Sequence, residues 1–193
     1  MRRHPLVLVA SCVLLLTGCG DAAKDGDAAR PPAAAASVPG KANDTDVMFL
    51  QMMATHHAEG LEMVRLAKQR ATRSDVKTLA AAIDTTETAE VDTMTGWLRA
   101  WGKPTAADPN ASVHASHAGM VSTGPVRIAS LRQATDADFD QTFINLLIGH
   151  QHNAVELARM ETAGGAYPEA KDLAKRIDES RTAQISMMLR MLG

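Results

Sequence analysis

Two adjacent histidines, His56 and His57, lie among several other side chains that can bind metal ions. Met52 and Met53 precede them by one helical turn, and Glu59 follows them. Imidazole nitrogen with thioether sulfur suits Cu(I), whereas imidazole with carboxylate suits Cu(II), zinc or iron. The types and spacing of these residues indicate a metal-binding site.

The stretch that contains these histidines occurs twice in the chain. Residues 46–63 read DVMFLQMMATHHAEGLEM, and residues 140–157 read DQTFINLLIGHQHNAVEL. An offset of 94 positions, that of Asp46 and Asp140, relates the two copies and continues beyond them. Further pairs at this offset include Phe49 and Phe143, His56 and His150, Arg65 and Arg159, Asp84 and Asp178, and Leu98 and Leu192. An offset that stays constant over two successive helices indicates duplication of a helical hairpin.

The second copy lacks two of the candidate ligands, because Gln151 replaces His57 and Leu147 replaces Met53. It has two histidines of its own, His150 and His152. They lie two positions apart, about 200° round an α-helix, so they cannot face the same point.

The apolar stripe of the second copy contains His150, whereas His152 is expected to face outward or toward the connecting segment. From the stripe, His150 can approach His56 across a bundle. The prediction is one dominant site centred on His56 and His57 and completed by Met53, with His150 as a further candidate.

The elements that must position these residues are helices. Apolar residues recur at steps of three and four over residues 44–71, 74–102, 135–164 and 168–193, and no segment alternates with the period of a strand. A short helix is expected over residues 125–133. Short loops within each hairpin favour antiparallel pairs, so the fold class is an all-α four-helix bundle. Its parts are repeat one (44–102), a connection (103–134) and repeat two (135–193).

Several residues mark the expected helix ends. Ser74 or Asp75 is expected to cap the second long helix, and Gly102 to end it. Thr135 and Asp138 have the spacing of a capping box before the third long helix. Gly164 and Gly165 end that helix, and Pro168 occupies the first turn of the last one.

Glu87, Glu90 and Met94 lie on the apolar stripe of residues 74–102. A buried carboxylate is costly unless it is paired or binds a metal. Two interpretations follow. Glu90 or Met94 could add a ligand to the histidine site, or the carboxylates could pair with a cation such as Arg181, which stands 94 positions after Glu87.

The connection carries His114, His117 and Met120. Their spacing lets three ligands converge if the segment forms a helical turn, which predicts a weaker secondary site. A solvated polar loop with coincidental histidines is the equal alternative.

The N-terminus has the features of a lipoprotein signal. A short basic region precedes an apolar run over residues 6–16, which is too short to span a bilayer. This apolar run leads into Leu16-Thr17-Gly18-Cys19, a segment that resembles the bacterial lipobox. We expect a signal peptide over residues 1–18, lipidation of Cys19, and a flexible tether rich in Ala, Pro, Gly and Asp over residues 19–43. An ordinary secretory signal is the alternative.

Cysteine content and charge narrow the chemistry further. Cys12 leaves with the signal and Cys19 is lipidated, so a soft metal site must be built from Met and His. Without Arg2 and Arg3, 18 basic residues face 22 acidic ones, a formal charge of −4. This balance gives no support for nucleic-acid binding.

Two motifs resemble those of the bacterial domain of unknown function 305 family. They are D-x-x-F-x-x-x-M-x-x-H-H from Asp46 to His57 and I-x-x-x-x-x-x-E-V-x-x-M-x-x-W-L from Ile83 to Leu98. The resemblance implies a ferritin-like helical bundle, exported to the envelope, with copper binding in characterised members. Met53, His56 and His57 match the M-x-x-H-H motif. His150 matches its second copy, from which Leu147 and Gln151 depart.

The sequence therefore predicts a lipid-anchored protein on the extracytoplasmic side of the cell membrane that binds copper, as Cu(I) or Cu(II), for sequestration or handover rather than catalysis. A carboxylate-bridged di-iron enzyme is an alternative, but its Glu-x-x-His pattern is absent, and His56-x-x-Glu59 runs the other way. A metal-free helical interaction module is the third possibility. A copper-delivery partner or a homo-oligomer is left open.

Overall fold

The computed structural model describes residues 41–107 and 123–193, and these form an all-α bundle. Four long helices and one short helix follow one another along the chain: α1 (Asp44–Arg70), α2 (Ser74–Ala100), α3 (Gly124–Gln133), α4 (Phe139–Gly164) and α5 (Pro168–Leu192). The predicted fold class of two helical hairpins with a short helix between them is confirmed.

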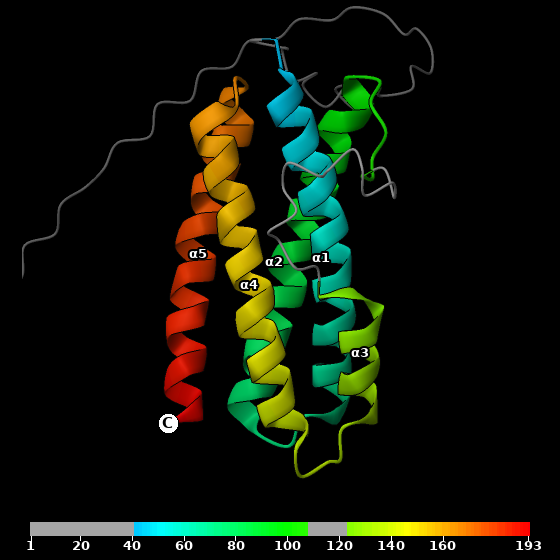
Figure 1. The fold of residues 1–193 in the computed structure, drawn as a ribbon, viewed down its shortest axis with the longest axis vertical. Coiled ribbons are helices and arrows are strands. Elements are labelled where there is room, and N and C mark those ends of the chain that lie inside the picture. The colour runs from blue at the N-terminus through cyan, green and yellow to red at the C-terminus, as the bar shows by residue number, and fades with distance from the viewer. Residues whose placement is uncertain (1–40, 108–122) are drawn as a thin grey trace, which may run out of the picture. The chain divides into compact units, whose positions relative to one another are not determined.

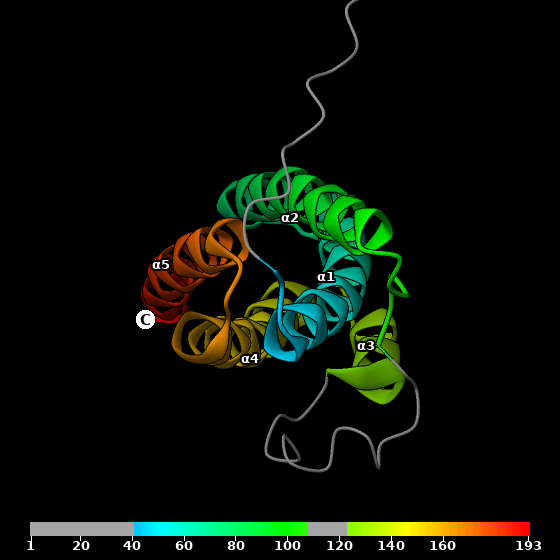
Figure 2. The same cartoon turned by 90° about the horizontal axis from the view of Figure 1, so that it is seen from above.

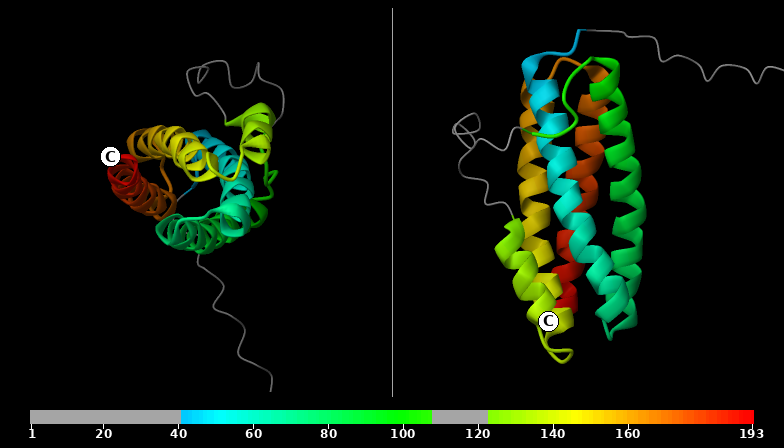
Figure 3. Two further views of the ribbon diagram at one scale, coloured as in Figure 1. Left: turned by 90° about the horizontal axis from the view of Figure 1, so that it is seen from below. Right: turned by 90° about the vertical axis from the view of Figure 1, so that its right-hand side faces the viewer.

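The two hairpins pack through their first helices. α1 and α2 form one antiparallel pair and α4 and α5 the other, with α1 lying against α4 (Figure 1). Seen from above, the four long helices surround a common interior, and α3 lies outside it (Figure 2). α3 packs beside α1 and α4, near the end of the bundle where α1 ends and α4 begins (Figure 3).

Local sequence signals account for three helix ends. Asn43 accepts a hydrogen bond from the Asp46 backbone N–H, and the Asp46 carboxylate accepts one from the Asn43 N–H, which completes a capping box at the start of α1. Gly102, with φ of 65°, follows the end of α2 in the left-handed region that glycine tolerates. Pro168 is the first residue of α5.

Two predicted caps are wrong in detail. Neither Ser74 nor Asp75 caps α2, because the N-cap is Arg73 and it makes no side-chain capping bond. α4 begins at Phe139, four residues after Thr135. Thr135 and Asp138 do bond to each other, but they stabilise the turn that precedes the helix.

The α1–α2 and α4–α5 turns are held by the opposite hairpin. The Asp46 carboxylate accepts hydrogen bonds from the backbone N–H groups of Ala166 and Tyr167, at 3.0 and 2.9 Å, in the α4–α5 turn. The Asp140 carboxylate accepts the equivalent bonds from Thr72 and Arg73 in the α1–α2 turn, at 3.1 and 2.8 Å.

Ala166 and Tyr167 stand 94 positions after Thr72 and Arg73, so the two sets of turn contacts are related by the internal repeat. Surface ion pairs repeat as well, since Arg65 pairs with Asp84 and Arg159 with Asp178. The duplicated sequence therefore forms a bundle with internal two-fold symmetry.

The interior holds two apolar clusters with polar side chains between them. One cluster, near the start of α1, includes Phe49, Met53, Met94 and Ile177. The other, near the end of α1, includes Phe139, Phe143 and residues of all four long helices. Burial of these apolar side chains supplies the main stabilising free energy of the bundle. None of the helices in the described part of the chain is long and apolar enough to cross a membrane.

Candidate metal centre

A layer of polar side chains crosses the middle of the bundle. We call it the polar layer, and it comprises His56 and His57 on α1, Glu87 and Glu90 on α2, His150 and Gln151 on α4, and Arg181 and Gln184 on α5. Six of these residues are buried, and Glu90 and Gln184 are half-buried. Polar groups are stable in such a position only when they are hydrogen-bonded or bind a ligand.

His56 and His150 meet at the centre of this layer. Their rings stack with centroids 3.7 Å apart and planes 14° from parallel, and His56 Nε2 lies 3.1 Å from the His150 backbone oxygen, to which it can donate. The predicted approach of His150 to His56 is confirmed. Burial is the main reason that the pKa of each ring lies below its usual value, with His150 at about 3, so both imidazoles are neutral at neutral pH.

His57 is the first member of a chain of polar side chains that links α1, α2 and α5. His57 Nε2 lies 2.7 Å from Glu90 Oε2, and the same oxygen accepts a hydrogen bond from the Arg181 guanidinium. Arg181 Nη2 also lies 3.6 Å from Glu87 Oε1. Of the two interpretations of these carboxylates, pairing with Arg181 is the one observed.

The two glutamates differ in their proton affinity. Burial raises the pKa of Glu87, and the nearby His57 and Arg181 only partly oppose this effect. Burial also acts to raise the pKa of Glu90, but the hydrogen bond with His57 and the Arg181 charge outweigh it and hold the pKa below its usual value.

The second repeat keeps the geometry of this layer and changes its charge. Gln151 donates to Gln184 Oε1 at 2.9 Å, and these two residues stand at the repeat positions of His57 and Glu90. The contact between the two helices of a hairpin at this level is thus made by a histidine and a carboxylate in the first repeat. In the second repeat it is made by two neutral amides. The second repeat therefore offers a single imidazole, His150, to the interior.

Ring nitrogens in the polar layer lack partners. His56 Nδ1, His57 Nδ1 and His150 Nε2 are buried without a hydrogen bond to any described residue. Unprotonated imidazole nitrogen is a strong ligand for copper and zinc, so the chemistry of these atoms fits a metal ion.

The described side chains do not form a complete site. Over residues 41–107 and 123–193, no three His, Cys, Asp or Glu side chains converge in a metal-binding arrangement. Met53 and Met94, both predicted ligands, are fully buried in the apolar cluster next to the polar layer. Met53 precedes His57 by one turn, and Met94 follows Glu90 by one turn.

The remaining candidates lie apart from this layer or outside the described residues. His152 is exposed on α4, as expected. The predicted secondary ligands His114, His117 and Met120 fall outside the described residues, and so does the predicted lipidation site, Cys19.

Sequence reasoning missed two residues next to His150. Thr123, just before α3, has its hydroxyl 2.7 Å from His150 Nδ1, and Gly60 on α1 lies directly beside the ring. Nothing in the local sequence of Thr123 signals this contact. Gly60 falls on the apolar stripe of α1, where glycine is unusual, and that was the available signal.

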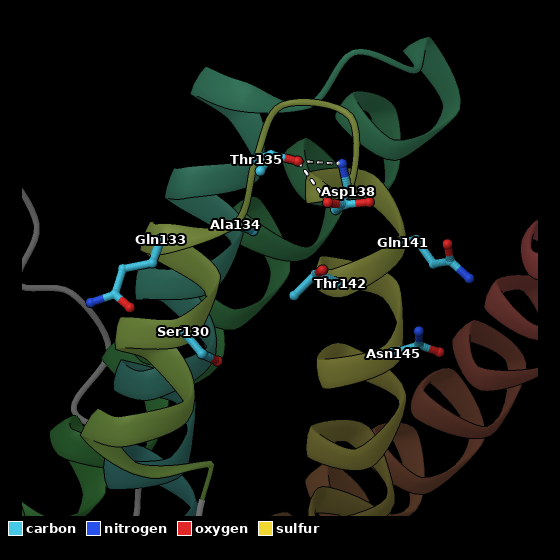
Figure 4. A pocket seen from close by; sticks show the side chains of 8 residues that line it. All are labelled: Ser130, Gln133, Ala134, Thr135, Asp138, Gln141, Thr142 and Asn145. Carbon is cyan, nitrogen blue, oxygen red and sulfur yellow. Dashed lines mark hydrogen bonds between the residues drawn. The ribbon is translucent and has the colours of Figure 1, made fainter.

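A surface depression between α3 and α4 is separate from the polar layer. It is lined by residues of both helices and the turn between them, including Ser130, Thr135, Asp138 and Asn145 (Figure 4). Thr135 donates to the Asp138 carboxylate at 2.7 Å within it. The depression contains none of the candidate ligands.

The fold and the polar layer define a class of protein: an all-α bundle of two duplicated hairpins whose first helices bring histidines together in the interior. The chain belongs to the family described as Domain of unknown function (DUF305), whose model matches residues 46–192. A search of curated proteins found no match.

Solved structures support this assignment. A DUF305 fragment from Deinococcus radiodurans is 28% identical, with a TM-score of 0.68 over 79% of this chain and 97% of that one. A DUF305 protein from Streptomyces coelicolor is 24% identical, with a TM-score of 0.69 over 77% and 90%, and shows the shared fold.

A third similar structure contains a metal. CopM in its Cu(I)-bound form is 26% identical to this chain, with a TM-score of 0.62 over 76% of this chain and 94% of CopM. CopM has also been solved in Cu(II)-bound and silver-bound forms. A protein of this fold therefore binds copper.

Proposed function

We propose that this protein binds copper for sequestration or handover, and that it does so outside the cytoplasm as a lipid-anchored protein. The observation that carries the proposal is the set of buried imidazoles on α1 and α4 whose ring nitrogens His56 Nδ1, His57 Nδ1 and His150 Nε2 have no partner among the described residues. Copper binding by the similar protein CopM supports it.

The dominant copper site is centred on His56 and His57. Met53, one turn before His57, supplies a thioether, and His150 supplies a third imidazole from across the bundle. A site of imidazole and thioether without thiolate suits Cu(I). His114, His117 and Met120 form a weaker secondary site in the connection.

The anchor rests on the sequence. Leu16 to Cys19 resembles a lipobox, and residues 19–43 have the composition of a tether. A cargo-binding role needs no catalytic group, and in the polar layer the carboxylates are paired with Arg181.

Metal analysis of the full chain, extracted in detergent, tests the proposal. We expect copper to be bound in preference to zinc in competition titrations with Cu(I), Cu(II) and Zn(II). Changing His56 and His57 together to Ala should abolish the tightest copper binding, whereas the exposed His152→Ala change should leave it intact. Equal copper affinity in wild type and double variant, with unchanged helicity, would contradict this site.

A further inference from the structure

Gly60 marks a point in the polar layer where side chains of two other helices converge. A β-carbon on Gly60 would lie 2.6 Å from Glu87 Oε2 and 2.7 Å from His150 Nε2. Both atoms therefore lie beside the same small volume, which is free only because residue 60 has no side chain. Any other residue would push one of them away.

Neither atom makes a hydrogen bond of ordinary geometry with a described residue, although the Gln151 side chain lies near the Glu87 carboxylate. Glu87 is 0% exposed and His150 1% exposed, so solvent does not supply one. A buried polar atom without a partner costs about 1–3 kcal/mol, and more if it is charged. Two such atoms facing one point indicate that a ligand binds between them.

The other nitrogen of His150 is held in the manner of a metal ligand. His150 Nδ1 lies 2.7 Å from the hydroxyl of Thr123, which is itself buried. When Nδ1–H donates to this hydroxyl, the neutral ring presents a lone pair at Nε2 toward Gly60. Metal-binding histidines are commonly oriented by such a hydrogen bond from the second ring nitrogen.

The charge of the layer favours a cation at this point. The layer holds two carboxylates, Glu87 and Glu90, and both pair with the single guanidinium of Arg181. Arg181 approaches Glu87 at Oε1, which leaves Oε2 on the Gly60 side.

We propose that Glu87 Oε2 and His150 Nε2 bind one divalent cation of the Cu(II) or Zn(II) class over Gly60. Carboxylate with imidazole and no thioether suits these ions better than Cu(I). Bonds of about 2.0–2.2 Å to each ligand allow one ion to bridge two atoms up to about 4 Å apart. The site shares His150 with the proposed copper site, so the two ions compete for its Nε2, and it goes beyond that site because it needs neither His56, His57 nor Met53.

Titration of the metal-free full chain with Zn(II) and Cu(II), followed by calorimetry and by Cu(II) electron paramagnetic resonance, tests the site. Glu87→Gln keeps the shape of the side chain and removes its charge, and Gly60→Ala fills the space. We expect each change to weaken divalent binding at least tenfold and to remove the resonance signal of one nitrogen-ligated Cu(II). The matched control is Gly96→Ala on α2, where nothing lies within 4 Å of an added methyl group.

The outcomes separate this site from the proposed copper site. Glu87→Gln should retain tight Cu(I) binding, and His57→Gln should retain the divalent site. Wild-type affinity for Zn(II) and Cu(II) in folded Glu87→Gln protein would overturn the inference while leaving the copper proposal standing. Equal loss of Cu(I) and divalent binding in that variant would overturn it too, because the two sites would then be one.

Discussion

His56 and His150 are equivalent residues of the two repeats, and their rings stack on each other at the centre of the bundle with centroids 3.7 Å apart. Equivalent residues can meet face to face only near the axis that relates the repeats. The candidate metal centre therefore lies where the internal symmetry brings the same position of both halves together.

The first prediction concerns His57. Changing it to Gln should preserve the fold, because Gln151 occupies the equivalent position and bonds to Gln184 in the same way. Copper affinity should fall about tenfold or more, since the ring nitrogen is lost. Competition titration with a Cu(I) chelator measures the change. His152→Ala, on the exposed side of α4, is the control and should bind copper like wild type.

Arg181 provides a test of the buried charges. It is the largest of the fully buried side chains in the described residues, and it pairs with both Glu87 and Glu90. Arg181→Met should lower the free energy of unfolding by about 3–5 kcal/mol, because the buried Glu87 and the half-buried Glu90 both lose their cation. Urea unfolding measures this. The exposed Arg176→Met change on the same helix should stay within about 0.5 kcal/mol of wild type, and an equally small effect of Arg181→Met would contradict the assignment.

Asp46 and Asp140, which bind the turn of the opposite hairpin, should contribute about equally to stability. Asp46→Ala and Asp140→Ala each remove several hydrogen bonds to backbone N–H groups that then have no acceptor. We expect each to lower the free energy of unfolding by about 1–3 kcal/mol. Thermal unfolding of both variants is the measurement, with the exposed Asp92→Ala as the control. A loss of stability in only one of the two variants would contradict equivalent roles for Asp46 and Asp140.

Glu161 should make stability depend on pH. Burial, and a hydrogen bond to Asp46, raise its pKa to about 8, so the folded protein holds a proton that the unfolded chain releases above about pH 4.5. The free energy of unfolding should therefore fall as pH rises from about 5 to about 8, by on the order of 2 kcal/mol. Glu161→Gln should remove this fall.

The comparison with the variant isolates this carboxyl group. His56 and His150 act in the opposite sense, because their lowered pKa values make stability fall as pH drops below about 6.5. Their effect is common to wild type and variant and cancels in the difference. A difference that stays constant between pH 5 and pH 8, to within about 0.3 kcal/mol, would contradict the prediction.

Replacing Cys19 tests whether the protein is anchored to a membrane. A lipid chain at this residue is the attachment that the sequence predicts, and no described helix can cross a membrane. Cys19→Ser should move the protein from the membrane fraction to the soluble fraction, as fractionation and immunoblotting would show. Retention of the variant on membranes after a high-salt wash would contradict lipid anchoring.

Much of the fold could be predicted because it follows from patterns within single helices. The periodicity predicted four long helices, the short loops predicted their antiparallel pairing, and the offset of 94 predicted the duplication. The place of His56 and His150 on equivalent stripes predicted that they can meet. The Arg181 ion pair was one of two interpretations, since an apolar stripe shows that Glu87 is buried but not which residue faces it.

The rest of the site depends on contacts between distant segments. The Thr123 hydroxyl reaches His150 from the start of α3, and the absence of a side chain at Gly60 matters only because Glu87 and His150 come from two other helices. The start of α2 also depends on the other repeat. The Asp140 carboxylate binds the Thr72 and Arg73 N–H groups of the turn just before this helix, a contact that the local sequence does not show.

The exchange of turn contacts between Asp46 and Asp140 couples the folding of the two hairpins. The turn of each hairpin has its backbone N–H groups bound by a carboxylate of the other hairpin. A hairpin that opens therefore leaves the turn of its counterpart without acceptors, so the two halves should unfold together in one transition rather than one after the other.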